Sequence, residues 1–123
     1  MIVKKLLEQQ TEKNLPCLDP EVKTTNVQQC LSQGTESARE GNYQKAIEDF
    51  DRVLEIEPNC AKGYYNRGQA RYELGDYPGA MEDFNQALAI EPQYAVAYNS
   101  RGNALRTIGE QEEALKDFSL ALQ

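Results

Sequence analysis

Residues 61–94 read AKGYYNRGQARYELGDYPGAMEDFNQALAIEPQY, and the same residue types return before and after this segment at a fixed interval of 34 positions. The recurring residues are small, acidic or apolar. They are Gly34, Gly68 and Gly102; Gly41, Gly75 and Gly109; Ala46, Ala80 and Ala114; Asp49, Asp83 and Asp117; Phe50, Phe84 and Phe118; and Leu54, Leu88 and Leu122. A fixed period of this size is typical of a solenoid, in which supersecondary units stack along one axis.

Each period predicts two helices joined by a tight turn. Residues 61–74 carry apolar and small side chains at helical spacing and are followed by Gly75 and Asp76. A glycine directly after a helix can adopt the left-handed conformation that closes its last turn. Asp76 then offers a carboxylate oxygen to the free N–H groups of the next helix. Pro78 fits the first turn of that helix, where a missing N–H has little effect.

The second helix of the period carries one apolar stripe, formed by Ala80, Phe84, Ala87 and Leu88. We expect Gly68 on the first helix to face Ala80, because two small residues let the helices approach closely while Phe84 fills the space beyond. The largest buried side chains of the protein are predicted to be the phenylalanines of this stripe, Phe50, Phe84 and Phe118.

The period resembles the tetratricopeptide repeat (TPR), a 34-residue helix–turn–helix unit with the pattern W-x2-L-G-x2-Y, A-x3-F and P. The A-x3-F motif occurs at residues 46–50, 80–84 and 114–118. Pro58 and Pro92 occupy the terminal proline position. The chain departs from the pattern at the leucine position, which holds Gln33, Arg67 and Arg101.

The resemblance implies an all-α fold, a right-handed α-solenoid of three TPR helix–turn–helix units with an N-terminal extension. The expected units are TPR 1 at residues 27–60, TPR 2 at 61–94 and TPR 3 at 95–123, the last incomplete at its C-terminus, with the extension at 1–26. The expected helices are 27–40, 43–57, 61–74, 77–90, 95–108 and 111–122.

The N-terminal extension divides into two parts. Residues 1–13 carry an apolar face that is too small to fold alone, and we expect it to become helical only by docking on a repeat surface of the same chain or of another copy. Residues 14–26 contain two prolines and are interpreted as a connector.

Composition narrows the class of partner. The chain has 123 residues, with 13 basic and 20 acidic side chains, and a formal net charge of −7. This charge argues against nucleic acid or an anionic membrane surface as partner. No apolar run approaches the roughly 18 residues of a spanning helix, so no membrane insertion is expected. The N-terminus reaches Glu8 too soon for a signal-peptide core.

The cysteines and the missing histidine bear on location and chemistry. Three cysteines, Cys17, Cys30 and Cys60, fit a cytoplasmic protein. None has metal-ligand spacing and histidine is absent from the sequence, so no metal or other cofactor is expected. No serine or cysteine has an evident base beside it. The acidic pairs recur with the repeat, so architecture explains them better than catalysis. We therefore predict that the protein is not an enzyme.

The resemblance also implies a binding surface. In TPR arrays the first helix of each unit lines a concave groove. The candidate groove residues at these positions are Arg39, Lys62, Tyr65, Asn66, Gln69, Tyr72, Asn99, Asn103 and Arg106. Side-chain amides both donate and accept hydrogen bonds, so they can pair with the backbone of an extended peptide. Tyrosines add flat apolar area with a polar tip.

These residues favour a non-catalytic protein–protein interaction module, a scaffold or adaptor, that binds an extended peptide or a helix of a partner. Two alternatives stay open. One is a self-assembling structural TPR unit that forms homo-oligomers, and the other is a regulatory TPR domain of a larger enzyme. A solvent-facing helix surface is polar in any case, so polarity alone does not define the groove.

One familiar TPR ligand can be tested by residue. Chaperone-binding TPR domains hold the C-terminal carboxylates of a partner with lysine, arginine and asparagine at five groove positions. In this sequence those positions hold Leu31, Thr35, Asn66, Val96 and Ser100, of which only Asn66 agrees. Without the cations, bound carboxylates would stay uncompensated. A ligand of this kind is not expected.

The recurring aspartates suggest how the units are joined. Asp49, Asp83 and Asp117 share one repeat position, whereas Arg67 and Arg101 occur only in the second and third units. Pairing within a unit would leave Asp49 opposite a glutamine. We therefore predict ion pairs between units, Asp49 with Arg67 and Asp83 with Arg101, that fix the stacking angle.

Overall fold

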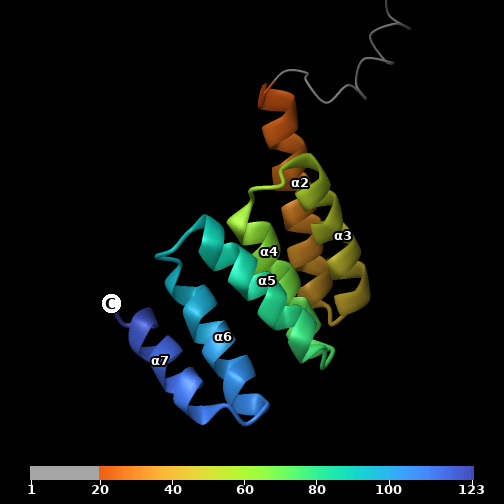
Figure 1. Cartoon of the computed structure of the whole chain (residues 1–123). Helices are drawn as coiled ribbons and strands as arrows, with labels where there is room; N and C mark the ends of the chain where they lie inside the picture. Colours follow the sequence, from red (N-terminus) through yellow and green to blue (C-terminus); the bar gives the residue numbers. More distant parts are fainter. Residues whose placement is uncertain (1–19) are drawn as a thin grey trace, which may run out of the picture.

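The computed structural model describes residues 20–123, with side chains described from residue 26 onward. This part of the chain is a series of six helices: α2 (Pro20–Arg39), α3 (Tyr43–Ile56), α4 (Ala61–Glu73), α5 (Tyr77–Ile90), α6 (Ala95–Thr107) and α7 (Gln111–Ala121). Consecutive helices form three hairpins, α2 with α3, α4 with α5, and α6 with α7 (Figure 1). The predicted all-α solenoid of three helix–turn–helix units is confirmed.

The first helix is longer than expected. It begins at Pro20, seven residues before the predicted start at residue 27, so residues 20–26 are helical and not a connector. The reason is that proline is tolerated at the first helical position, where its missing N–H would be unpaired anyway. The other helices begin at the predicted residues and end within one residue of the prediction. The expected helix in residues 1–13 lies outside the described residues.

The turns within the units follow the predicted chemistry. Gly41, Gly75 and Gly109 each have a positive φ, of 85°, 85° and 93°. A side chain is strained in this conformation, which explains why glycine recurs there. The Asp76 carboxylate accepts a hydrogen bond from the Gly79 N–H at 3.1 Å and so caps α5 as expected.

The core of each unit lies between its two helices. Phe50 and Phe84 are almost fully buried, as predicted. A Cβ atom on Gly68 would lie 2.8 Å from the Phe84 ring, so this glycine is needed for the close approach of α4 and α5. Phe118 is only half-buried, contrary to the prediction. Among the described helices α7 packs on α6 alone, so this ring has a neighbour on one side only.

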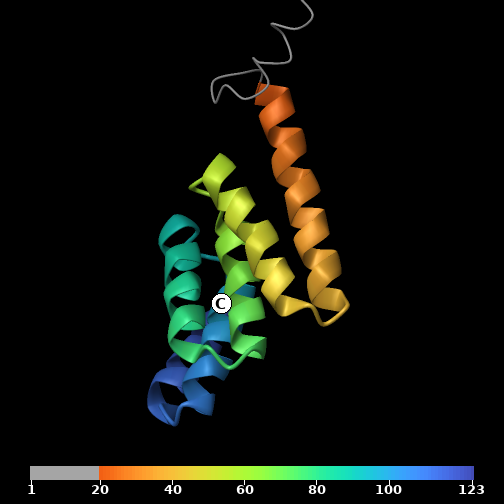
Figure 2. The same cartoon turned by 90° about the vertical axis from the view of Figure 1, so that its right-hand side faces the viewer.

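The units stack so that the first helices lie close together. Helix α4 packs on α3 and α6 packs on α5, and contacts also join α2 to α4 and α4 to α6. Among the described residues no such contacts join α3 to α5 or α5 to α7. Figure 2 shows the same stack from the side, with the N-terminal part of α2 extending beyond α3. The helices α2, α4 and α6 therefore share one face of the molecule.

The predicted pairing of the arginines is wrong. Arg67 pairs with Asp83 of its own unit, with Nε and Nη2 lying 3.0 and 2.8 Å from the carboxylate oxygens. Arg101 pairs in the same way with Asp117, at 2.8 Å for both bonds. Each pair joins the facing helices of one hairpin. The bonds to Asp83 hold the pKa of Arg67 above its usual range.

The arginines do reach the preceding unit, through a different residue from the predicted one. Nη1 of Arg67 donates to Asp51 at 2.8 Å, and Nη1 of Arg101 donates to Asn85 at 2.8 Å. Asp49 needs no arginine from the next unit, because other groups compensate its charge. It accepts from Arg52 at 2.8 Å and from Ser37 at 3.3 Å, and Lys45 lies 3.7 Å away.

Two further properties concern the described part of the chain. No group of three or more acidic or thiol side chains among these residues is arranged to hold a metal ion. No helix between residues 20 and 123 is long and apolar enough to cross a membrane.

Candidate binding groove

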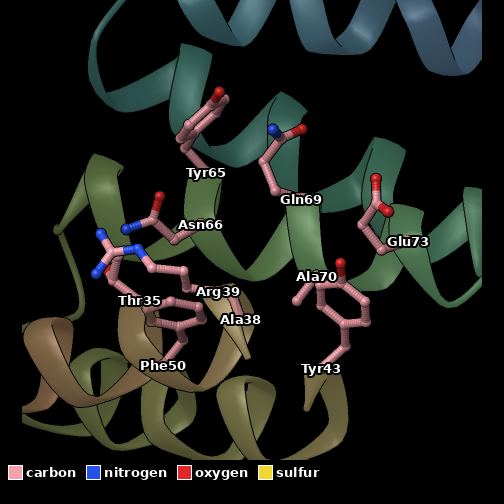
Figure 3. Close-up of a pocket in the computed structure, with 10 residues that line it drawn as sticks. All are labelled: Thr35, Ala38, Arg39, Tyr43, Phe50, Tyr65, Asn66, Gln69, Ala70 and Glu73. Atoms are coloured by element: carbon pink, nitrogen blue, oxygen red, sulfur yellow. The ribbon is translucent and has the colours of Figure 1, made fainter. Parts of the chain in front are cut away.

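Three adjoining pockets run along the first helices of the units and together form what we call the groove. The central pocket, of about 450 Å³, lies between α2 and α4 (Figure 3). The α2-side pocket, of about 260 Å³, shares Thr35 and Arg39 with it. The α6-side pocket, of about 240 Å³, lies between α4 and α6 and shares Tyr65, Gln69 and Glu73 with the central one.

Helical spacing brings the lining residues of the central pocket together. Residues three and four apart lie on one helix face. On α2 the lining residues at this spacing are Thr35, Ala38 and Arg39. On α4 they are Asn66, Gln69, Ala70 and Glu73. Tyr65 on α4 and Tyr43 and Phe50 on α3 complete the lining.

The central pocket combines an apolar bottom with a polar mouth. Phe50 and Ala70 are almost fully buried, at 1% and 2% exposure, and so form its bottom, whereas Gln69 and Glu73 are exposed. Figure 3 shows the rings of Phe50 and Tyr43 on one side of the pocket, with Gln69 and Glu73 on the other. A ligand side chain in this pocket would meet aromatic surface below and hydrogen-bonding groups above.

Tyr65 forms the wall between the central and α6-side pockets and is held from several sides. Its ring lies 6.0 Å from the Phe84 ring and 5.3 Å from the Tyr94 ring, measured between centroids. Its hydroxyl accepts a hydrogen bond from Ser100 Oγ at 3.3 Å. Because these contacts come from α5, α6 and the residue before α6, the position of this wall depends on the stacking of the second and third units.

Charge changes sign along the groove. Arg39 and Lys62 line the α2-side pocket together with one carboxylate, Glu36. Arg39 pairs with Glu36 at 2.9 Å, but both side chains are exposed, at 71% and 58%. Exposed pairs of this kind contribute little to stability. Glu73 lines the central and α6-side pockets, where no cation lies beyond Arg39.

The structure brings together all but one of the residues expected in the groove. Those that line at least one of the three pockets are Arg39, Lys62, Tyr65, Asn66, Gln69, Tyr72, Asn99 and Asn103. Arg106 lines none of them. Its guanidinium lies 5.9 Å from the centroid of the Phe118 ring, and Nη2 donates to Asn103 Oδ1 at 3.2 Å.

Two of the positions that hold carboxylates in chaperone-binding TPR domains carry buried side chains in this protein. Leu31 and Ser100 are buried, at 6% and 7% exposure. The basic side chains of the groove, Arg39 and Lys62, stand at other positions. The arrangement therefore lacks the set of cations that such a ligand needs.

The residues expected from the sequence lie at the mouth of the groove. The residues that form its apolar bottom were not predicted as groove residues. Phe50 was predicted as a core residue, and Tyr43 and Ala70 were not singled out in the sequence. The available signal was Ala38, which stands at the repeat position of Tyr72 and leaves the space below it open.

The sequence matches the family model of the tetratricopeptide repeat over residues 37–104. This is more than half of the chain, and it includes the whole central hairpin, α4 with α5. None of the curated proteins compared with the sequence matches it significantly.

Several solved structures are similar to this chain. The second TPR of Spaghetti (RPAP3), bound to the HSP90 peptide SRMEEVD, is 28% identical with a TM-score of 0.77, over 83% of this chain and 96% of that one. The TPR2B domain of yeast Sti1, in a complex with pHsp70, is 25% identical with a TM-score of 0.77, over 79% and 78%. The type III secretion translocator chaperone SycD of Yersinia enterocolitica, at 19% identity and a TM-score of 0.78 over 82% and 75%, supports the fold alone.

Proposed function

This chain belongs to the tetratricopeptide repeat family, and from that premise we propose that it is a non-catalytic interaction module that binds an extended peptide or a helix of a partner protein. The observation that carries the proposal is the groove of three adjoining pockets along α2, α4 and α6. Two similar structures are complexes with HSP90 or Hsp70 ligands, which supports a peptide as the kind of ligand.

The groove chemistry suits a peptide bound through its backbone. Asn66, Gln69, Asn99 and Asn103 line the central and α6-side pockets. Each amide can donate to a peptide carbonyl and accept from a peptide N–H, whatever the peptide sequence. A ligand that depends on terminal carboxylates is disfavoured, because the cations it needs are missing from the corresponding positions. We expect micromolar affinity, about −8 kcal/mol.

Self-assembly is the second candidate, and one observation favours it. Leu115 and Leu122, on and just after α7, are 65% and 89% exposed, and Leu120 beside them is 40% exposed. Apolar side chains gathered on one helix mark a surface that can be covered by another molecule. Light scattering over a concentration series distinguishes the two candidates, because self-assembly predicts a mass that rises with concentration and a groove module predicts a constant one.

Selection from a library of random dodecapeptides tests the groove directly. We expect selected peptides to bind the intact protein in the micromolar range and to lose about tenfold in affinity to the double variant Asn66→Ala with Asn103→Ala. The melting temperature should stay the same, because neither amide is buried in the core. The matched control is Gln44→Ala with Gln86→Ala, which removes two exposed amides from α3 and α5, outside the groove.

The outcomes separate clearly. Peptides that bind the groove variant as tightly as the intact protein would contradict the proposal, and so would a library that returns no binder sensitive to the groove substitutions. Unfolding of the Asn66 and Asn103 variant would show that these asparagines are structural.

A further inference from the structure

One repeat position near the end of each first helix holds a different side chain in every unit. It holds Ala38 in the first unit, Tyr72 in the second and Arg106 in the third, each 34 residues apart. In the third unit the Arg106 guanidinium lies over the Phe118 ring, 5.9 Å from its centroid. In the third unit the side chain at this position therefore lies over the core phenylalanine of its own unit.

In the second unit a tyrosine occupies this space. The Tyr72 ring meets the Tyr77 ring edge-on, with centroids 5.3 Å apart. It also packs on the buried cluster that contains Phe84, and its hydroxyl forms a hydrogen bond with Thr107 Oγ1 at 3.0 Å. As a result neither Tyr77 nor Phe84 lines the α6-side pocket above them.

In the first unit the same space is open. Ala38 has only a methyl group, and the equivalents of Tyr77 and Phe84, which are Tyr43 and Phe50, both line the central pocket. This pocket measures about 450 Å³, against about 240 Å³ for the α6-side pocket beneath which Tyr72 lies. The first unit has the aromatic surroundings of Tyr72 without the ring itself.

We propose that the central pocket receives one aromatic side chain of the bound peptide, in the place that Tyr72 occupies in the second unit. The inference rests on the proposed function and specifies its ligand. Aromatic rings prefer edge-on or offset contacts with other rings, and the Tyr43 ring offers such a contact, as Tyr77 does to Tyr72. Asn66 and Gln69 at the mouth pair with the peptide backbone on either side of the ring.

Charge complementarity assigns the neighbouring residue of the peptide. Arg39 and Lys62 meet in the α2-side pocket against the single carboxylate of Glu36. The exposed pair of Arg39 with Glu36 exchanges readily for a ligand carboxylate, since it contributes little in water. On the opposite side Glu73 disfavours an acidic group. The ligand therefore carries an acidic residue on the α2 side of its aromatic residue.

Small probes test the pocket without a known ligand. The probes are N-acetyl-tyrosine amide, N-acetyl-leucine amide and N-acetyl-lysine amide, followed through the methyl NMR signals of Ala38, Ala70 and Thr35. We expect saturable shifts with the tyrosine probe at millimolar affinity, which is usual for ligands of this size. The leucine probe should bind about fivefold more weakly, because it lacks the ring contacts, and the lysine probe should produce no shift.

Two variants make the test specific. Ala38→Tyr should fill the pocket and abolish the shifts of Ala70 and Thr35, while the fold is retained as in the second unit. Its control, Ala89→Tyr, makes the same change at an exposed position of α5 and should bind the probes normally. Tyr72→Ala should create a second pocket, so that the tyrosine probe also shifts the Ala104 methyl signal, which the intact protein does not show.

The results distinguish this inference from the proposed function. Equal binding of the leucine and tyrosine probes, the absence of any shift, or unchanged shifts in folded Ala38→Tyr would each overturn the aromatic pocket. Library peptides that bind in the groove but lack an aromatic residue beside an acidic one would also overturn the aromatic pocket. The peptide-binding function would still stand in that case. A library without groove-dependent binders would overturn that function, and the probes would still decide the pocket.

Discussion

The first and second units share the helix–turn–helix arrangement and the core motif, but they differ in side chains on the facing surfaces of their helices. Three of the differences at equivalent positions are Gln33 against Arg67, Ser37 against Arg71, and Ala38 against Tyr72. In the second unit two arginines hold the buried carboxylate of Asp83, and a tyrosine fills the space over the core. In the first unit the carboxylate of Asp49 is held by Ser37 and by the exposed Arg52, and the space is open.

This comparison separates two roles of the repeat. The recurring glycine, alanine and phenylalanine set the distance between the helices, and they are the same in both units. The positions that differ decide how strongly neighbouring units are joined and whether a ligand can enter. The second unit is the cross-linked centre of the array, and the first unit carries the deeper part of the groove.

The largest expected effect tests whether the second unit is the stable centre. Phe84→Ala should lower the free energy of unfolding by about 3–5 kcal/mol, because it leaves a cavity in a fully buried site. Phe118→Ala should cost about 1–2 kcal/mol, because that ring is only half-buried. Urea unfolding followed by circular dichroism measures both. Equal losses at the two sites would show that the second and third units contribute evenly and that the second unit is not the stable centre.

Removing the charge of the buried aspartate should also destabilise the protein more in the second unit than in the first. Asp83→Asn removes the charge partner of Arg71 and one of the two charge partners of Arg67, which is only 18% exposed, so we expect a loss of about 3 kcal/mol. Asp49→Asn should cost about 1–2 kcal/mol, because Arg52 is 57% exposed and can turn to water. The urea midpoints of the two variants at neutral pH measure both losses in stability. A larger loss at Asp49 would contradict the assignment of partners.

Transferring the arginine should make the first unit resemble the second. Gln33→Arg places a guanidinium where Arg67 stands in the second unit, and we expect it to reach Asp49 and to stabilise the protein by about 1 kcal/mol. The rise in melting temperature should be about 4–8 °C. Gln33→Lys is the control, because it adds the charge without the two-pronged geometry. Equal gains from arginine and lysine would mean that charge alone matters.

The sequence predicted the helices well because their signals are local. Glycine after a helix, an acidic cap and the spacing of apolar residues each depend on neighbours within a few positions. The start of α2 was wrong because a proline can end one segment or begin another, and local pattern does not decide between them. The arginine pairs were wrong because helical spacing says which face a residue occupies, and not which of two nearby carboxylates it reaches.

The groove was predictable only at its surface. Helix positions that face outward in every unit can be counted from the repeat, and nearly all the residues chosen in this way line a pocket. The central pocket is deep because Ala38 has only a methyl group. A single small residue does not change the polar and apolar pattern of its helix. It becomes visible only when equivalent positions of the units are compared, as with Tyr72.

The smallest expected effect concerns the residues that precede two of the first helices, Cys60 before α4 and Tyr94 before α6. Cys60 Sγ accepts from the Gly63 N–H at 3.3 Å, whereas Tyr94 makes no such bond to cap its helix and packs its ring on Tyr65. Burial raises the pKa of Tyr94 above its usual value, and the nearby Tyr65 and Glu91 raise it further. The folded protein therefore disfavours the ionised phenol.

The raised pKa of Tyr94 determines the direction in which the stability of the protein changes at alkaline pH. The protonated Tyr94 contributes its full stability below about pH 10, where a tyrosine of the unfolded chain ionises, and the contribution is lost as the pH rises through the raised value of the folded state. Urea midpoints between pH 9 and 11 should therefore fall more steeply for the intact protein than for Tyr94→Phe. Tyr77→Phe, which removes a phenol from α5, is the control. If both variants flatten the pH dependence equally, the effect comes from alkaline charge in general, and the aromatic packing before α6 has no part in it.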